Sequence, residues 1–265
     1  MKRRFRNKFL SMFVAVCMVL GMVMAFPLSG GAAEPPPGPY ASLAAWFADG
    51  GDSVLTQDGS NYTLSVSHML EYHVTIDSGE KLIVSGPNVF TIGSYLTVAS
   101  GGSLSVDNSD NLGTGTLTLD SGTLSVGSGA NITQNISLSG SGGTVDVPIG
   151  DAALSGSITG TNLIKTGAGK LILTGINAGV TVNAGTFEIN GNVSGVVTVS
   201  NGTATINGNI TNNLIVSGGS VTITGTVSGT VSHTGGTINT YAVSGTPCAC
   251  AFCNRVPQSP SARRG

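Results

Sequence analysis

Three short segments of the sequence hold side chains that could bind a metal ion or move protons. They are His68-x-x-Glu71-x-His73, the run DNSDN at 107–111, and Cys248-x-Cys250-x-x-Cys253. Imidazoles and thiolates are ligands of zinc, and carboxylate and amide oxygens are ligands of calcium. The elements that carry these residues decide whether any segment forms a site.

The histidine segment does not bring its three groups together on an extended chain. Side chains two residues apart on a strand share a face, so Glu71 and His73 point one way and His68 points the other. We therefore expect no metal site at these residues.

The acidic segment lacks the ordered spacing and the bidentate glutamate of a dedicated calcium loop. We predict that Asp107 and Asp110 lie in a solvated corner. The carboxylates that follow, Asp120, Asp146 and Asp151, form only loose clusters in the sequence.

The three C-terminal cysteines are an odd number for a closed set of disulfides. A zinc site would need a fourth ligand, and the nearest candidate in the sequence is His233. We expect His233 to face solvent at the last repeat, and we predict an irregular tail over 243–265. A zinc site at Cys248, Cys250 and Cys253 is the alternative.

Charge is distributed unevenly along the chain. Five of the eleven basic residues precede the first apolar run and three lie in the last eleven positions. Thirteen acidic residues and only Lys81, Lys165 and Lys170 occupy 34–254, which gives that part a net charge of −10. A surface of this sign repels the phosphate backbone, so we expect no nucleic-acid partner.

The N-terminus has the organisation of a secretory signal peptide. A cationic start precedes eighteen uncharged residues from Phe9 to Phe26, and the small residues Gly31-Ala32-Ala33 follow. We predict a signal peptide over 1–33, cleaved after Ala33, with cleavage after Ala25 as the second choice. An uncleaved membrane anchor is the alternative, since eighteen apolar residues approach the span of a bilayer. Otherwise membrane contact is expected only during export. A Pro-rich linker, 34–41, comes next.

Internal repeats dominate the rest of the chain. Residues 180–196, 197–213 and 214–230 align with a period of 17, and glycine returns at 185, 202, 219 and 236, and again at 191, 208 and 225. Within each block the apolar residues alternate, pause at a turn and alternate again, as strands with one buried face do. The predicted inward columns are Val182, Val199 and Val216; Phe187, Ala204, Val221 and Ile238; Ile189, Ile206 and Ile223; and Val193, Ile210 and Val227.

This pattern predicts a solenoid, because one such coil buries its apolar face only when neighbouring coils cover it. Looser copies of the same unit, longer and less evenly spaced, run back towards Val74. We predict an all-β, right-handed parallel β-helix of about ten coils over 74–242. Residues 42–73 are expected to form an N-terminal cap and a first irregular coil, in which Ser42 caps a short helix and Leu43, Trp46 and Phe47 cover the end of the stack.

One stretch resembles a known family. In TNLIKTGAGKLILTGINAGVTVNAGTFEING, at 161–191, the residues Leu163, Lys165, Gly167, Gly169, Leu171, Leu173 and Gly175, then Thr181, Val182, Gly185, Thr186, Phe187 and Ile189, match the autotransporter-associated β-strand repeat. The resemblance implies a right-handed β-helix at a bacterial surface, with an adhesive or structural role. In contrast to such passengers, we expect no membrane barrel within these 265 residues, so that the chain is either a fragment of a longer protein or a freely secreted protein that uses the repeat.

A second, more distant resemblance lies at Ser42–Val54. This segment is similar to the short helix and the "G-D-T-V" motif that open many pectate-lyase-like β-helices. Enzymes of that class use an arginine base with calcium-binding carboxylates, or several Asp with His, Arg or Lys. Here no arginine occurs between Leu82 and Asn254, and Glu188 is the only formally charged residue from Leu171 to Pro247. We therefore predict no catalytic, cofactor-binding or metal-binding residues.

Together these observations predict a secreted or surface-exposed, non-enzymatic β-helix of structural or adhesin-like function. The expected partners are cell-surface glycans or other surface proteins, and no cofactor is expected. A polysaccharide-binding or polysaccharide-degrading β-helix is the alternative.

Overall fold

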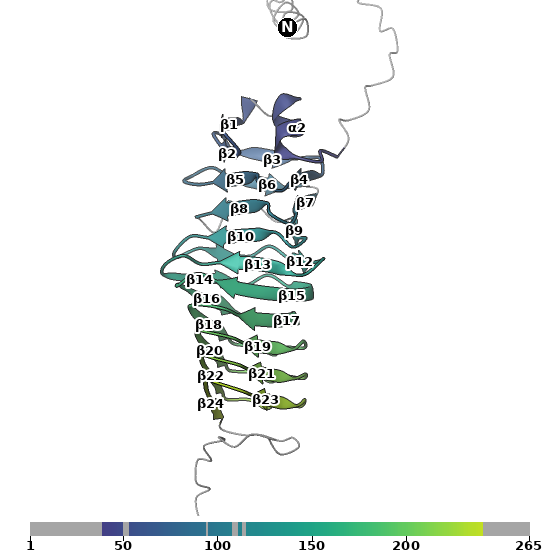
Figure 1. The fold of residues 1–265 in the computed structure, drawn as a ribbon. Coiled ribbons are helices and arrows are strands. Elements are labelled where there is room, and N and C mark those ends of the chain that lie inside the picture. The colour runs from purple at the N-terminus through teal and green to yellow at the C-terminus, as the bar shows by residue number, and fades with distance from the viewer. Residues whose placement is uncertain (1–38, 50–52, 94, 108–110, 113–114, 241–265) are drawn as a thin grey trace, which may run out of the picture. The chain divides into compact units, whose positions relative to one another are not determined.

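A computed structural model describes residues 39–49, 53–93, 95–107, 111–112 and 115–240, which belong to one compact unit, 38–265. The expected signal peptide, most of the linker and the cysteine tail lie outside the described residues. Within them the chain forms 24 strands and one short helix, α2 (Leu43–Ala48). Apart from β1 (Leu55–Asp58), which pairs antiparallel with β2, the strands of the described residues pair in parallel. Figure 1 shows the strands stacked rung upon rung.

The coils have three faces, which we number in chain order. Face 1 comprises β2 (Asn61–Leu64), β5 (Lys81–Val84), β8 (Ser103–Val106), β10 (Thr123–Val126), β13 (Gly143–Asp146), the ends of β15 (Ile158–Thr166) and β17 (Asn177–Val182), β19 (Val197–Val199), β21 (Leu214–Val216) and β23 (Val231–His233). Ten rungs therefore follow one another on this face, about nine turns of the solenoid.

Faces 2 and 3 complete each turn. Face 2 comprises β3 (His68–Leu70), β6 (Phe90–Ile92), β11 (Asn131–Ile132), β14 (Asp151–Leu154), β16 (Lys170–Leu173), β18 (Thr186–Ile189), β20 (Thr203–Ile206), β22 (Ser220–Ile223) and β24 (Thr237–Thr240). Face 3 comprises β4 (Val74–Ile76), β7 (Tyr95–Val98), β9 (Thr116–Leu119), β12 (Ile136–Leu138) and the start of β15.

The coils shorten along the stack. Paired residues on face 1 are 22, 20, 21 and 20 positions apart from Leu82 to Lys165, and then 17 apart as far as His233. The shortening removes most of face 3, which continues only as single bridges between Ile176, Val193, Ile210 and Val227. The strict period of the sequence is thus the period of a coil with two full strands.

The predicted inward columns are confirmed. Val182, Val199, Val216 and His233 are successive partners on face 1, and Phe187, Ala204, Val221 and Ile238 are partners on face 2. The members of these columns are fully buried except for the last of each, and they belong to one continuous core. The expected all-β parallel solenoid is therefore the observed fold.

The two series of glycines that recur every 17 residues have different structural roles. Gly202 has φ +78, a left-handed conformation that favours glycine at a tight corner. Gly208 has no such φ, but a Cβ there would collide with the carbonyl oxygen of Gly191 in the preceding coil. Asparagines also stack as expected at the corners, where Nδ2 of Asn207 donates to Oδ1 of Asn190 at 2.8 Å.

The N-terminal end of the stack is covered by α2, as the sequence predicts. The Ser42 side chain accepts a hydrogen bond from the Ala45 amide, and Leu43 and Trp46 are buried. Phe47 packs against the core and its ring lies 5.8 Å from that of Tyr62. The helix is too short to be stable alone, so its position depends on this packing.

Candidate functional site

Several of the charged side chains in the described residues hold the solenoid together. Both carboxylate oxygens of Glu80 accept hydrogen bonds from the first amides of α2, at Leu43 and Ala44, each at 2.9 Å. The same carboxylate accepts from the amide of Asp77. Glu80 therefore fastens the cap to the second coil and is not offered to a ligand.

The histidine segment is divided between two environments. The ring of His68 lies 5.5 Å from Trp46 and 6.4 Å from Phe90, and burial lowers the pKa of His68. His73 lies on face 3, where its Nε2 is 2.9 Å from Oγ1 of Thr97. Trp46 is thus a plug in the end of the core, as expected. No group of three potential ligands is arranged for a metal among the residues that the structure describes.

The acidic corner was predicted only in part. Asp107 is exposed, and its carboxylate accepts from the amide of Gly86 at 3.2 and 3.3 Å. Asn111, however, is buried and donates from Nδ2 to the carbonyl oxygen of Asn88 at 2.6 Å. The expectation of a solvated corner over 107–111 was therefore wrong for Asn111, whose side chain is held by the backbone of the preceding coil. Asp110 lies outside the described residues.

Lys165 is a charged residue whose burial was not predicted from the sequence. It occupies the inward column of face 1 between Val145 and Val182 and is fully buried. Its ammonium donates to the carbonyl oxygens of Thr166 at 2.5 Å, Gly167 at 2.9 Å and Ala184 at 3.5 Å. Burial lowers the pKa of Lys165, and the charge of Asp146 opposes that shift. The signal was in the sequence, since Lys165 stands one full period before the inward Val182.

One ion pair lies on the outer surface of face 2. Nζ of Lys170 is 2.6 Å from Oε2 of Glu188 on the next rung, and both side chains are partly exposed. The hydrogen bond between them raises the pKa of Lys170 and lowers that of Glu188. Glu188 is thus paired, and an exposed pair of this kind contributes about 0–1 kcal/mol.

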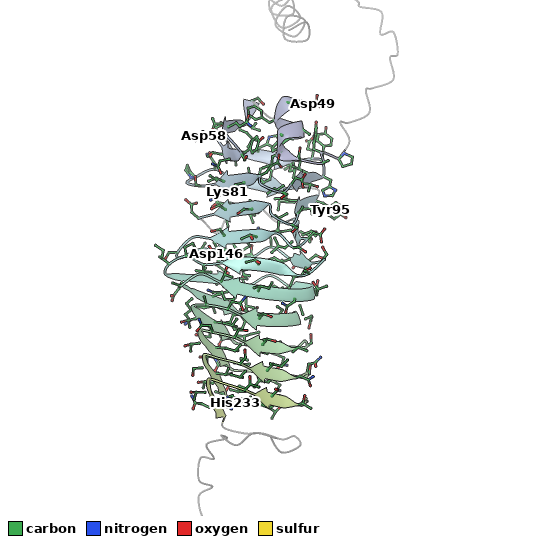
Figure 2. The ribbon with its side chains drawn as sticks, in the orientation of Figure 1. Asp49, Asp58, Lys81, Tyr95, Asp146 and His233 are labelled. Carbon is green, nitrogen blue, oxygen red and sulfur yellow. The ribbon has the colours of Figure 1, made fainter. Side chains whose placement is uncertain are left out.

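An exposed aromatic group lies on face 3 near the N-terminal end. Tyr95 is 61% exposed, and its ring is packed edge-on against that of His73, with 6.3 Å between their centroids. His73 in turn contacts Thr97. We call His73, Tyr95 and Thr97 the Tyr95 patch; Figure 2 shows Tyr95 at the lateral edge of the upper coils. An exposed aromatic ring beside a polar ring and a hydroxyl group can stack on a sugar and bind its hydroxyls.

Tyr40 adds one further bridge to face 3, on the N-terminal side of β4. Its backbone bridges Val74, its amide donates to the carbonyl oxygen of His73, and its hydroxyl donates to Oδ2 of Asp49 at 2.9 Å. Burial, reinforced by Asp49, raises the pKa of Tyr40 to about 12. The hydroxyl therefore stays protonated at neutral pH and holds the linker side of the cap in place.

A shallow hollow of about 380 Å³ opens where the coils shorten. Three successive corners line it: 155–158, 174–177 and Asn192. It is lined by neutral polar side chains such as Ser157, Thr174 and Asn177, together with buried Ile158 and Ile176. The hollow is polar and uncharged, so it offers no acid or base for catalysis.

The comparisons with known proteins give one relative. The chain is 34% identical over 122 residues, 43% of its length, to the adhesin BmaC autotransporter of Brucella suis biovar 1 (strain 1330). The match covers 4% of that protein's length. No protein-family model and no solved structure matches the chain.

The described residues contain no helix long and apolar enough to cross a membrane. The apolar segment from Phe9 to Phe26 lies outside them. The resemblance to autotransporter passengers is supported by the adhesin relative, whereas the distant resemblance to pectate-lyase-like β-helices is not confirmed.

Proposed function

We propose that this protein is an exported, surface-exposed β-helix with an adhesin-like, non-enzymatic function. The observation that carries the proposal is the similarity to an autotransporter adhesin in a chain that folds as a parallel β-solenoid. The roles of Glu80, Lys165 and Glu188 support the non-enzymatic part, because each is paired with a structural partner.

The outer surface suits extended, neutral ligands. Successive rungs of face 3 present Thr75, Thr97, Thr118, Ser137 and Thr159 in one outward column. Neighbouring strands lie about 4.8 Å apart, so the column is a regular ladder of hydroxyl groups. The Tyr95 patch stands on the same face and provides the aromatic surface that the ladder lacks. We place glycan binding there.

The Tyr95 patch also favours the second candidate, a polysaccharide-binding β-helix, since both functions would use it. A degrading enzyme has no comparable support, because the patch holds no carboxylate and no arginine. The two candidates differ in the source of the glycan, a host or neighbouring cell for an adhesin and a polysaccharide matrix for the alternative.

The test is binding to an array of neutral oligosaccharides and to immobilised matrix polysaccharides. Tyr95→Ala should weaken binding by about tenfold, as loss of an exposed aromatic anchor commonly does. Ile215→Ala is the matched control, because Ile215 is also outward-facing and partly exposed, but lies on face 1 far along the stack. Equal binding by the two variants would reject the Tyr95 patch. Release of shortened or unsaturated sugars by the wild-type protein would reject the non-enzymatic proposal.

A further inference from the structure

One column of corner residues runs through the hollow that opens where the coils shorten. Each of its members immediately precedes the inward, buried residue of face 3 in its coil. We call it the corner column; its residues are Asn135, Ser157, Gly175, Asn192, Asn209 and Thr226. Ser157, Gly175 and Asn192 line the hollow, one from each of three successive coils. Figure 1 shows the rungs becoming shorter after β15, where these corners lie.

Hydrogen bonds join the corner column from coil to coil at three places. The Ser157 amide donates to Oδ1 of Asn135 at 3.1 Å. The Asn209 amide donates to Oδ1 of Asn192, and the Thr226 amide donates to Oδ1 of Asn209, each at 2.9 Å. At these places a side-chain oxygen of one coil is the acceptor for a backbone amide of the next coil.

This series is interrupted at the hollow. The residue that would accept from the Asn192 amide is Gly175, which has no side-chain oxygen. No other group of the described residues accepts a hydrogen bond from this amide. Asn192 is exposed and lines the hollow. Because a backbone amide is a strong donor, a ligand oxygen that reaches it can take the place of the missing acceptor.

The backbone does not require glycine at position 175. Gly175 does not have a left-handed φ, and a Cβ built on it would lie 3.7 Å from its nearest neighbour, the carbonyl oxygen of Asn192. Every other glycine of the described residues either has a left-handed φ or would place a Cβ within 3.0 Å of another atom. Gly175 therefore differs from them in that its effect is to leave the hollow open.

The chemistry of the interrupted column indicates the ligand. In the next two coils the acceptor is the carboxamide oxygen of an asparagine, and an acetamido group carries the same carbonyl beside a methyl group of the size of Cβ. Exposed Ser157, Thr174 and Asn177 line the same hollow and can bond to hydroxyl groups. All lining residues are uncharged, and the volume of about 380 Å³ lies at the lower end of that of small-molecule sites. These features suit one uncharged sugar residue with an acetamido group.

We propose that the hollow at Gly175 is a subsite for a single uncharged N-acetylhexosamine residue. The acetamido carbonyl oxygen of the sugar accepts the hydrogen bond of the Asn192 amide, and the ring hydroxyls bond to Ser157, Thr174 and Asn177. The inference rests on the proposed glycan-binding function and adds to it a second site, apart from the Tyr95 patch.

Saturation-transfer difference NMR of the folded protein tests the ligand class. N-acetylglucosamine or N-acetylgalactosamine should show transfer to the acetamido methyl protons. Glucose and galactose should bind about tenfold more weakly, because they leave the Asn192 amide without its acceptor. Equal binding of the sugars with and without the acetamido group would overturn the proposal, and so would the absence of transfer to both N-acetylated sugars.

The substitution Gly175→Asn tests the place of binding without removing any contact of the fold. The new side chain should accept from the Asn192 amide, as Asn192 accepts from Asn209. Thermal stability should be kept or raised, while binding of the N-acetylated sugar should fall at least about tenfold, because the acetamido place is filled. Thr226→Asn puts the same side chain in the same column outside the hollow, so it is the matched control and should bind as the wild type does. Undiminished binding by a folded Gly175→Asn variant would overturn the subsite.

The variant Tyr95→Ala separates this inference from the proposed function. It should lose binding on the glycan array but keep transfer to the acetamido methyl protons. Loss of that transfer would place the N-acetylated sugar at the Tyr95 patch and overturn the subsite at Gly175. Retention of N-acetylated sugar binding at the hollow, with array binding unaffected by Tyr95→Ala, would support the subsite and reject the Tyr95 patch.

Discussion

A single buried lysine shows how strongly context governs a side chain in this solenoid. Lys165 replaces valine in an apolar column, where an ammonium group without partners would be very costly. Three carbonyl oxygens converge on it at the corner where the coils become shorter. The charge is therefore accommodated by backbone groups of two successive coils rather than by a carboxylate.

Lys165 should make stability depend on pH. Because the pKa of Lys165 is lowered in the folded protein, the unfolded chain binds more protons at pH values between that pKa and about 10.5. Stability should therefore rise with pH through this window. Lys165→Met should remove that rise and cost about 1–2 kcal/mol at neutral pH, since three carbonyl oxygens lose their donor. Urea unfolding at several pH values measures both effects, and an unchanged rise in the variant would exclude Lys165 as its cause.

At the scale of elements, some contacts were readable from the sequence and others were not. Ser42 and the apolar residues after it indicated α2 correctly, because an N-cap is a local signal. The role of Glu80 at the same helix was not predicted, since it lies far from Leu43 in the sequence and depends on how the first coils stack. The N-cap of α2 could be predicted from neighbouring residues, whereas the contact between Glu80 and α2 depends on the tertiary structure.

The same distinction explains the strands. From residue 180 onward the strict period of 17 identifies each inward column from the sequence alone. The Tyr95 patch lies among the longer coils of variable length, where no fixed period aligns His73 with Tyr95. Pairing there depends on loop lengths at the corners, so this candidate site was not predicted.

The strand β20 offers a direct test of the register. Ile206 is fully buried and Thr205 faces outward. Ile206→Asp should cost more than about 3 kcal/mol, because it buries an unpaired carboxylate. Thr205→Asp should cost at most about 1 kcal/mol, mainly through repulsion from Glu188 on the adjacent rung. Thermal unfolding followed by circular dichroism measures the difference. Equal midpoints for the two variants would contradict the assigned faces.

At the scale of the whole solenoid, each coil is stabilised mainly by the coils on either side of it. Val180, Val197 and Leu214 are successive partners on face 1, and Thr186, Thr203 and Ser220 are successive partners on face 2. Stability in such a stack is approximately a sum over neighbouring coils. An entire coil should therefore be removable without disturbing the rest, provided that the period is respected.

Removal of Val197–Asn213 tests this property together with the proposed function. The deletion brings Leu214 onto Val180 and Ser220 onto Thr186, so every inward column should keep its register and the stack should only shorten. A shorter deletion, 197–204, would instead place Thr205 and Asn207 at the inward positions of Val197 and Val199, and should prevent folding of the later coils. Circular dichroism distinguishes these outcomes.

Glycan binding by the one-coil deletion then locates the functional surface. The Tyr95 patch and the hydroxyl ladder of face 3 both precede the deleted coil, so binding should fall by no more than the share of surface that is lost. A catalytic or single binding site within 197–213 would instead be abolished with the coil. A deletion variant that folds and retains its thermal transition but binds no glycan would contradict an extended adhesive surface. That result would indicate one discrete binding site in the deleted coil.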